Sequence, residues 1–195
     1  KLERFGYEMI APDRGMLANG DDGDGRMPEP EVLFKYILRE LACEKDLAGK
    51  KVLVTAGATM EAIDPVRYIT NHSSGKMGCA VAKAAMQRGA KVTLVAGHME
   101  VLPPMFVDVV NVKSAADMFE AVTKLAPEQD IIVKAAAVAD YTPVAVADNK
   151  IKKSDDDMKI ELKRTKDILG YLGQHKRDGQ VICGFSMETQ DVIKN

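Results

Sequence analysis

Hydrophobic and polar positions from about Lys50 onwards follow two alternating patterns. Short apolar runs rich in β-branched residues predict buried parallel strands, and they cover 50–57, 91–97, 107–112, 130–137 and 180–186. Apolar residues at helical spacing predict helices over 76–89, 115–125 and 165–176. A polar run at 158–163 adds a strand-like segment after an irregular stretch at 138–156. Alternating strands and helices predict an α/β class: a Rossmann-like, doubly wound, mostly parallel sheet with helices on both faces.

The helical segments also predict which side chains face the sheet. In the helix that Gly89 ends, the predicted apolar face consists of Met77, Ala80, Val81, Ala84 and Ala85. In the helix at 165–176, it consists of Ile168, Leu169 and Leu172. Ser114 followed by Asp117 is typical of an N-cap with an acidic residue at the third helical position, so a helix is predicted to begin there and to end at Leu125.

The first quarter of the chain has a different pattern. Residues 11–30 are rich in Gly, Asp and Pro and predict irregular structure. A short helix is predicted over 31–41, where apolar residues recur at near-helical spacing. The run Asp46-Leu-Ala-Gly49 breaks the pattern. We therefore expect a domain boundary there, with one part over 1–48 and a second over 49–195.

Composition narrows the classes of function. The 195 residues are 46% hydrophobic and 29% charged, which is typical of a soluble globular protein. The formal net charge of −2 argues against a nucleic-acid binder that relies on bulk positive charge. No apolar run approaches the ~20 residues that cross a bilayer, so no membrane association is expected. Three widely separated cysteines predict no disulfide and no metal site, and favour free thiols in a reducing cytoplasm.

The segment 68–78, Y-I-T-N-H-S-S-G-K-M-G, interrupts the regular pattern directly before a helix. Unpaired N–H groups and the positive end of the helix dipole favour a phosphate at such a place, and the hydroxyls of Ser73 and Ser74 add donors. Gly75 and Gly78 would let an anion approach the backbone closely. The alternative is that one serine is merely the N-cap and the glycines are turn residues.

The neighbourhood of this loop favours a ligand site of an uncommon kind. In a doubly wound sheet, ligands lie at the carboxyl ends of the strands. Residues at or near those ends are Gly57, Gly97, Ala137 and Phe185. The Walker phosphate loop is excluded, because Thr70 and Met77 occupy positions where it needs glycine and Ser or Thr. The dinucleotide fingerprint is also absent, since A-G-A-T-M-E follows the first strand.

Three motifs occur in order along the second part of the chain: V-T-A-G-A-T-M-E-A-I-D-P-V-R-Y-I-T-N-H-S-S-G-K-M-G (54–78), A-A-A-V-A-D-Y (135–141) and K-I-K-K (150–153). With them, the chain closely resembles phosphopantothenoylcysteine synthetase in its bacterial, CTP-using form. The resemblance implies a ligase of coenzyme A biosynthesis. CTP would activate the phosphopantothenate carboxylate to an acyl-cytidylate with release of pyrophosphate, and L-cysteine would then displace CMP to form the amide.

The resemblance assigns catalytic and substrate-binding roles. Lys150 matches the family lysine essential for the first half-reaction and is expected to contact the α-phosphate. Asn71 matches the asparagine that binds the acyl-cytidylate. Taken alone, these residues would belong to a solvated loop face and a turn. Arg67 is expected to bind a phosphate of the substrate, with a simple ion pair to Asp64 as the alternative.

A larger set is expected to bind the nucleotide. Ser73, Ser74 and Gly75 would cradle the triphosphate, and Asp140 would accept hydrogen bonds from the ribose. Ala136 and Ala137 would contact the cytosine edge through backbone groups, with strand packing as the alternative. The other expected nucleotide contacts are Gly57, Lys150, Thr165, Lys166, Asp167, Ile168 and Phe185. By its residue type alone, Phe185 would be an ordinary core aromatic. Mg²⁺ is expected with the triphosphate, held mainly by phosphate and water. The family implies a homodimer.

The segment 18–30, A-N-G-D-D-G-D-G-R-M-P-E-P, carries a second resemblance. It looks like the end of the flavin-dependent phosphopantothenoylcysteine decarboxylase, which is fused ahead of the synthetase in the bifunctional bacterial protein. FMN would bind in a part of that domain outside this chain. Asn19 aligns with the family's proton-donating cysteine, so no decarboxylase activity is expected. Family members continue beyond Asn195 with a basic segment, so the second part is expected to be incomplete at its C-terminus.

Two functions of other classes stay open. One is an NAD(P)-binding, Rossmann-like oxidoreductase, against which the absent fingerprint weighs. The other is a non-catalytic regulatory homologue, suggested by Asn19 and by the position at which the chain ends.

Overall fold

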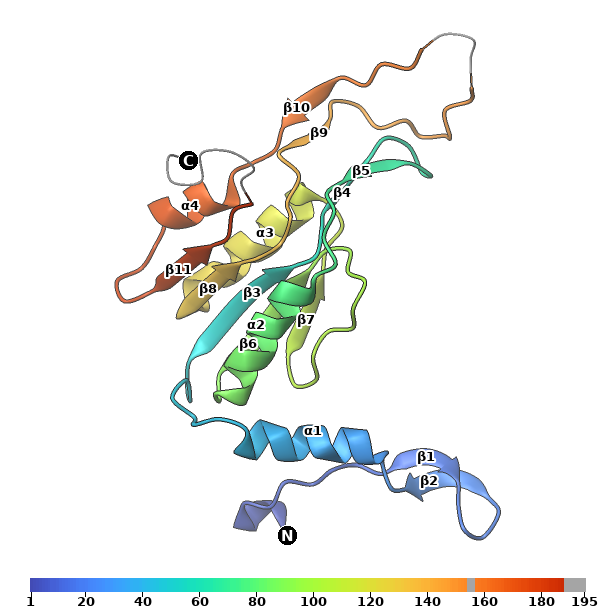
Figure 1. Ribbon diagram of the computed structural model, residues 1–195, viewed down its shortest axis with the longest axis vertical. Coiled ribbons are helices and arrows are strands. Elements are labelled where there is room, and N and C mark those ends of the chain that lie inside the picture. Colours follow the sequence, from blue (N-terminus) through green and yellow to red (C-terminus); the bar gives the residue numbers. More distant parts are fainter. Residues whose placement is uncertain (154–156, 188–195) are drawn as a thin grey trace. The chain divides into compact units, whose positions relative to one another are not determined.

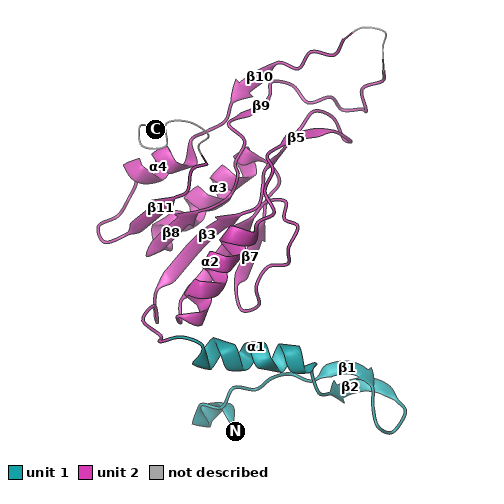
Figure 2. Cartoon of the chain, in the orientation of Figure 1, with its two compact units in different colours: residues 1–43 teal, residues 44–195 magenta. Residues whose placement is uncertain are grey.

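The computed structural model describes residues 1–153 and 157–187, and the chain divides into two compact units, Lys1–Cys43 and Glu44–Asn195 (Figures 1 and 2). Unit 1 holds a 3-10 turn (Glu3–Phe5), the antiparallel strands β1 (Asp13–Met16) and β2 (Asp22–Arg26), and the predicted helix, α1 (Pro30–Leu41). The expectation of irregular structure over 11–30 is wrong. Gly20, with φ 87°, and Asn19, whose side chain accepts from the Asp21 N–H (3.2 Å), form a turn that allows the flanking residues to pair.

Unit 2 is built on a five-stranded parallel sheet (Figure 1). Across the sheet the strands are β11 (Val181–Gly184), β8 (Ile131–Lys134), β3 (Lys51–Ala56), β6 (Lys91–Ala96) and β7 (Asp108–Asn111). Every neighbouring pair is parallel. If these five strands are numbered 1 to 5 in the order in which they occur along the chain, their order across the sheet, starting from β7, is 3-2-1-4-5. This is the strand order of dinucleotide-binding folds. The predicted Rossmann-like sheet is confirmed.

Helices cover both faces of this sheet. Successive residues of a strand point to opposite faces. Val52, Val54 and Leu94 therefore pack with α2 (Lys76–Gln87), whereas Leu53 and Ile132 pack with α3 (Ala115–Leu125) and α4 (Ile168–Gln174). The predicted cap of α3 is present as a full capping box, in which Ser114 accepts from the Asp117 N–H and Asp117 accepts from the Ser114 N–H.

The buried faces of two helices differ from the predicted ones. On α2 the buried residues are Gly78, Cys79, Ala82, Ala85 and Met86. Met77 is 46% exposed, and Ala80 and Ala84 are exposed as well. The reason is the close packing of Gly78 on β3, which turns the side of the helix that carries Gly78, Ala82 and Ala85 toward the sheet. On α4, Ile168 and Leu172 are buried as predicted, but Leu169 is 41% exposed.

Replacing Gly78 by alanine is expected to lower the free energy of unfolding by about 1–3 kcal/mol through overpacking. The added Cβ would lie 2.5 Å from Cβ of Ala56 and 2.8 Å from the Thr55 carbonyl oxygen. The midpoint of urea unfolding measures the effect. Gly173→Ala is the matched control, because nothing lies within 4 Å of a Cβ at that helical position. An unchanged midpoint for Gly78→Ala would contradict the close packing.

Two short antiparallel hairpins lie beyond the carboxyl end of the sheet (Figure 1). One pairs β4 (Met60–Ala62) with β5 (Tyr68–Thr70), and the other pairs β9 (Tyr141–Pro143) with β10 (Leu162–Arg164). The two hairpins meet where β4 contacts β9. The predicted polar run at 158–163 overlaps β10 at Leu162 and Lys163, and its residues 158–161 lie outside any strand. The other three strands were not predicted. All four have three residues each, too few for a period-two pattern to emerge.

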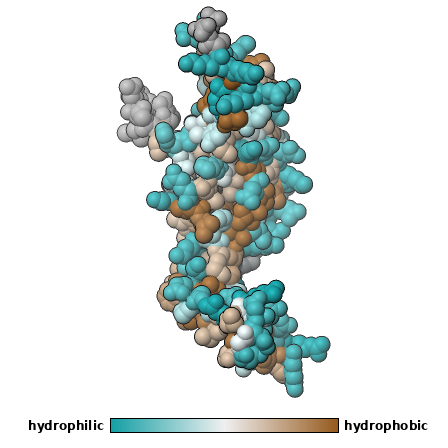
Figure 3. All heavy atoms as spheres, turned by 90° about the vertical axis from the view of Figure 1, so that its right-hand side faces the viewer, coloured by the Kyte–Doolittle hydropathy of each residue, from teal (hydrophilic) through white to brown (hydrophobic). Residues whose placement is uncertain are grey.

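The surface of unit 2 mixes charged and apolar side chains. On the face drawn in Figure 3, hydrophobic residues form patches between hydrophilic ones. Large exposed apolar side chains of this unit include Val66, Tyr68, Met77 and Leu102. Each helix in the described ranges is too short or too polar to span a bilayer. The cysteines Cys43, Cys79 and Cys183 are free thiols, and burial raises the pKa of Cys79.

Candidate functional site

The strand order places a switch point between β3 and β8, from which the chain winds in opposite directions. The buried Thr55, near the end of β3, accepts hydrogen bonds at Oγ1 from the N–H groups of Ala135 and Ala136, both at 3.1 Å. The Ala137 N–H donates to the Gly57 carbonyl (2.8 Å), and the Thr59 N–H donates to the Ala137 carbonyl (3.2 Å). The segments that follow β3 and β8 are therefore held side by side at the edge where this fold binds ligands.

The backbone hydrogen bonds of Ala136 and Ala137 limit which of their backbone groups can recognise the cytosine edge. Both backbone groups of Ala137 and the N–H of Ala136 have partners within the chain. A carbonyl oxygen has a second lone pair, so the Ala137 carbonyl can still accept from a cytosine amino group. Recognition of the base edge by this segment stays a prediction.

The glycines of the edge are closely packed rather than open. Gly57 has φ 78°, and a Cβ there would lie 2.3 Å from the His98 carbonyl oxygen. A Cβ at Gly75 would lie 2.6 Å from Cγ of Met99, which also fills the space beside Gly57. Gly78, expected to admit an anion, instead packs on β3. That expectation is wrong, because the position lies inside the helix–sheet interface.

The beginning of α2 is formed by backbone rather than by a serine. Gly75, with φ 76°, takes the N-cap position, and no side chain of the described ranges caps the helix. Ser74 Oγ accepts only a long hydrogen bond, 3.4 Å, from the Lys76 N–H. The alternative in which a serine is the N-cap is therefore wrong. Apart from that long contact to the Lys76 N–H, no side-chain hydrogen bond among the described residues reaches an N–H group in the first turn of α2, as an anion site requires.

Asn71 connects this loop to the second motif. Its Nδ2 donates to the Val138 carbonyl at 3.3 Å, and the neighbouring Thr70 hydroxyl donates to the Thr59 carbonyl at 2.7 Å. Thr59 Oγ1 in turn accepts from the Ala139 N–H at 2.9 Å. Asn71, more than sixty residues away in sequence, is thereby placed beside the A-A-A-V-A-D-Y segment.

Asp140 and the T-K-D-I segment lie together after β8 and β10. The Thr165 N–H donates to the Asp140 carbonyl (2.9 Å), and the Thr165 hydroxyl donates to the Ala139 carbonyl (2.7 Å). Asp167 is the N-cap of α4, where its side chain accepts from the Gly170 N–H at 2.9 Å. Ile168 is buried, so its side chain serves the core.

Lys166 of this segment and Phe185 after β11 have more exposed side chains. Lys166 places its ammonium 4.8 Å from the centroid of the Phe119 ring. Phe185 follows β11, and its N–H donates to the Lys134 carbonyl at 3.0 Å. The alternative in which Phe185 is a core aromatic is wrong, because the residue lies past the end of an edge strand and is 53% exposed. An exposed ring at this edge is compatible with the expected nucleotide contact.

Lys134 is a candidate that the sequence analysis missed. It ends β8 and is half-buried, and strand alternation places it on the face of Ile132, toward α3 and α4. Burial lowers the pKa of Lys134, and the Asp167 and Asp140 carboxylates oppose that shift. The signal in the sequence was a single charge in the otherwise apolar run I-I-V-K-A-A-A.

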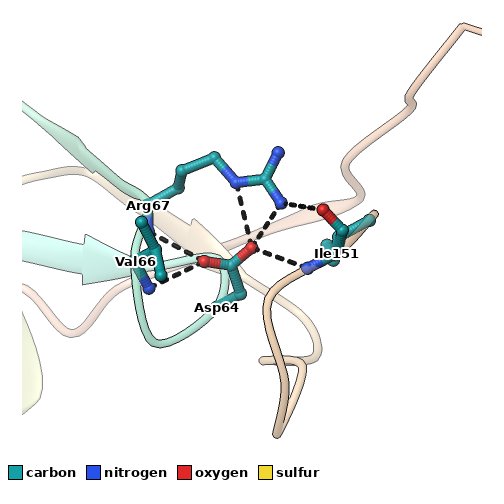
Figure 4. A network of polar contacts seen from close by, with 4 residues as sticks. All are labelled: Asp64, Val66, Arg67 and Ile151. Carbon is teal, nitrogen blue, oxygen red and sulfur yellow. Dashed lines mark hydrogen bonds and ion pairs between the residues drawn. The ribbon is translucent and has the colours of Figure 1, made fainter. Parts of the chain in front are cut away.

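Arg67 forms the ion pair that was the alternative to phosphate binding. Its Nη2 lies 2.5 Å from Oδ2 of Asp64 and also donates to the Ile151 carbonyl (2.7 Å; Figure 4). Its hydrogen bonds hold the pKa of Asp64 well below the ordinary value. The pair's contribution to stability is therefore present above the ordinary aspartate pKa of about 4, and it is lost only as pH falls through the lowered value.

Lys150 immediately precedes Ile151, so the 63–67 turn holds it close to β4 and β5. In the described ranges, no hydrogen bond or ion pair joins Lys150 to Ser73, Ser74 or Gly75. The contacts thus link the first motif to the second through Asn71 and to the third through Arg67, while Lys150 and the start of α2 remain unlinked.

Comparison with known proteins identifies the family. Residues 47–195 match the family described as DNA/pantothenate metabolism flavoprotein C-terminal domain. The chain belongs to this family. The C-terminal domain of a coenzyme A biosynthesis bifunctional protein CoaBC, known from a crystal structure, is 49% identical, with a TM-score of 0.65 over 75% of this chain and 68% of that one. The resemblance to the synthetase part of the bifunctional protein is therefore confirmed.

Full-length relatives place this family domain in a longer protein. The coenzyme A biosynthesis bifunctional protein CoaBC of Bacillus subtilis is 50% identical over 98% of this chain and 48% of its own length. A protein of an unknown prokaryotic organism, described as a cysteine/cysteine sulfinic acid decarboxylase, is 44% identical over 100% of this chain and 55% of its own length. The chain thus spans about half the length of these relatives.

Proposed function

We propose that this chain carries the phosphopantothenate–cysteine ligase step of coenzyme A biosynthesis and that CTP is its activating nucleotide. The supporting observation is the convergence of the three motifs at the carboxyl edge of a Rossmann-like sheet. Asn71 of the first motif bonds to Val138 of the second, and Arg67 of the first bonds to Ile151 of the third. Coenzyme A biosynthesis is also the function named for the Bacillus subtilis relative.

The first half-reaction joins two anions. A phosphopantothenate carboxylate oxygen attacks the α-phosphorus of CTP, and the bond to the β-phosphate oxygen breaks to release pyrophosphate. Negative charge develops on the transferred phosphoryl group, so fixed cations and N–H donors lower the barrier. We assign this task to the Lys150 ammonium, with Ser73, Ser74, Gly75 and the N–H groups in the first turn of α2 at the triphosphate.

The second half-reaction is an acyl transfer. The amine of L-cysteine attacks the acyl carbonyl, loses a proton, and CMP leaves as the mixed anhydride breaks. Asn71 Nδ2 has two N–H donors, so it would donate to the acyl-cytidylate either with its second N–H or after giving up its bond to the Val138 carbonyl. Asp140, Thr165, Lys166, Asp167 and Phe185 border the region proposed for the nucleoside. The backbone of Gly57, Ala136, Ala137 and Ile168 would complete it.

Mg²⁺ would enter with the nucleotide. Within the described ranges, no group of three or more His, Cys, Asp or Glu side chains could hold a metal ion. Phosphate oxygens and water would therefore be its ligands, and the ion would neutralise part of the triphosphate charge.

Domain organisation and assembly follow from the same proposal. Residues 1–48 would correspond to the end of the decarboxylase part with its linker, and 49–195 to the synthetase part. A homodimer would cover exposed apolar side chains such as Val66 and Tyr68 in the β4–β5 hairpin. Sedimentation analysis of the chain tests the dimer.

The experiment that tests the function is a coupled assay for pyrophosphate with CTP and phosphopantothenate, followed by mass spectrometry after cysteine is added. We expect pyrophosphate first, and then CMP and phosphopantothenoylcysteine. Carbon dioxide release from phosphopantothenoylcysteine is not expected, because Asn19 stands where the family has a cysteine. Binding of NADPH in preference to CTP would favour the oxidoreductase instead. No pyrophosphate release by the intact chain would favour a non-catalytic homologue.

Replacing Lys134 by methionine is expected to weaken CTP binding about tenfold, or ~1.4 kcal/mol, because a half-buried cation at the switch point is lost. Methionine preserves most of the buried stem. Isothermal titration measures the dissociation constant. Lys124→Met, in the last turn of α3, is the control with the same chemical change on an exposed site. If Lys134→Met binds CTP as tightly as the parent does, Lys134 contributes only to packing.

A further inference from the structure

The turn between β4 and β5 contains a carboxylate with more partners than a turn requires. The Asp64 side chain is 0% exposed. Its Oδ1 accepts from the N–H groups of Val66 and Arg67, each at 2.8 Å, which is the usual Asx-type closure of a turn. Its Oδ2 accepts from Arg67 Nε (2.9 Å) and Nη2 (2.5 Å), and also from the Ile151 N–H (3.1 Å), which belongs to a remote segment (Figure 4).

The remote segment, 144–161, leaves β9 and returns to β10. Its two ends are joined by the Val144 N–H and the Glu161 carbonyl, at 2.9 Å. Among its described residues, 144–153 and 157–161, three hydrogen bonds reach the rest of unit 2, and all of them go to the 63–67 turn. They are Ala147 N–H to Ile63 carbonyl (3.0 Å), Ile151 N–H to Asp64 Oδ2 (3.1 Å) and Arg67 Nη2 to Ile151 carbonyl (2.7 Å).

Both backbone polar groups of Ile151 are therefore held by one ion pair. The Ile151 N–H belongs to the peptide group that also contains the Lys150 carbonyl, so its bond to Asp64 fixes the plane of that peptide. A misplacement of about 1 Å can reduce a catalysed rate by a factor of about 10². The position of the Lys150 Cα, from which the ammonium extends, is thus fixed by Asp64 and Arg67.

We propose that Asp64 and Arg67 form a clamp that positions Lys150 for the first half-reaction by holding the Ile151 backbone. Both are positioning residues, and this role rests on the proposed function of Lys150. A buried carboxylate suits the task, because its paired charge is satisfied in only one register of the segment, whereas an apolar contact would tolerate slippage. The ion pair also keeps Asp64 from repelling the substrate's phosphates.

The main test compares Asp64→Asn with Glu61→Gln. In Asp64→Asn one carboxylate oxygen becomes an NH₂ group, which cannot accept from the Ile151 N–H. Glu61, a buried acid of β4, accepts from the Ala115 N–H and has no bond to the segment, so Glu61→Gln is the control. We expect Asp64→Asn to reduce kcat for pyrophosphate release at least tenfold, with the KM for CTP changed less than threefold. Hydrogen exchange at the Ile151 amide should accelerate at least tenfold, while amides of β3 and β6 should keep their protection in both variants.

A second variant tests the clamp from the other side and leaves the ion pair intact. Ile151→Pro removes the N–H that Asp64 accepts, and it also restricts the backbone at 151 and at the preceding Lys150. Asp148→Pro is its control, because it introduces the same backbone restriction into the segment without removing any of the three bonds. We expect a tenfold loss of kcat for the first and less than a twofold change for the second. Combining Asp64→Asn with Lys150→Gln should add no further loss, since both act on one lysine.

Separate outcomes overturn the clamp and the proposed function. Parental kcat in both Asp64→Asn and Ile151→Pro, or Ile151 exchange as slow as in the parent for Asp64→Asn, overturns the clamp. A loss confined to KM also overturns it, because that result assigns Arg67 a direct contact with substrate. Absence of pyrophosphate release from the parent chain overturns the proposed function alone, and hydrogen exchange still decides whether the clamp holds the segment.

Discussion

Replacing Lys150 by glutamine is expected to lower the rate of pyrophosphate release from CTP and phosphopantothenate about 10³-fold. The glutamine side chain is polar but uncharged, so the charge that develops on the α-phosphoryl group loses its cation. Since the Ile151 backbone still bonds to Asp64 and Arg67, the segment itself should stay in place. A coupled pyrophosphate assay under saturating substrates measures the rate.

The control for this variant is Lys91→Gln, which carries the same change at the amino end of β6, opposite the ligand edge. It should release pyrophosphate at the parental rate. Hydrogen exchange at the Ile151 amide should be unchanged in Lys150→Gln, which separates loss of the cation from loss of the clamp. Pyrophosphate release within twofold of the parent would remove Lys150 from the mechanism.

For Asn71→Asp, we expect amide formation to fall about 10²-fold while acyl-cytidylate accumulates. The Val138 carbonyl, which accepts from Asn71 Nδ2, would then face a carboxylate that cannot donate. The same negative charge would repel the acyl phosphate and remove a donor at the acyl carbonyl, and loss of one such donor costs a factor of about 10² to 10³. Quenched-flow mass spectrometry follows the intermediate and the amide separately.

The first half-reaction should proceed at close to the parental rate in Asn71→Asp, because Lys150 and the start of α2 are untouched. Asn111→Asp, which adds the same charge at the end of the edge strand β7, is the control and should form the amide normally. Product formation by Asn71→Asp at the parental rate would reduce Asn71 to a structural link between the motifs.

Much of the fold was predictable because its signals are local. The strands at 50–57, 91–97 and 130–137 are apolar runs that only a doubly covered sheet can bury, and Ser114 with Asp117 specifies the start of α3 within four residues. The short hairpins and the sheet-facing side of α2 were not predictable in this way. The face of α2 depends on the contact of Gly78 with Ala56, a residue that lies on another element.

The residues of the candidate site also divide into those that the sequence predicts and those that only the folded structure reveals. The three motifs identified the family and the residues to consider, since they are contiguous in sequence. Lys134 was missed because its significance depends on the Asp140 and Asp167 carboxylates, which reach it only through folding. For Phe185, residue type alone favoured the core and only the resemblance favoured a nucleotide contact, because residue type carries no information about a place past the end of an edge strand.

By itself, the sequence determined the parallel α/β class, the order of strands and helices along the chain, and the family, because periodicity and motifs are properties of adjacent residues. Only the tertiary structure decided that Arg67 is committed to Asp64 and Ile151, that Gly75 rather than a serine begins α2, and that Asn71 meets Val138. Hydrogen bonds and ion pairs of this kind join residues far apart in sequence, and their geometry exists only once the chain has folded.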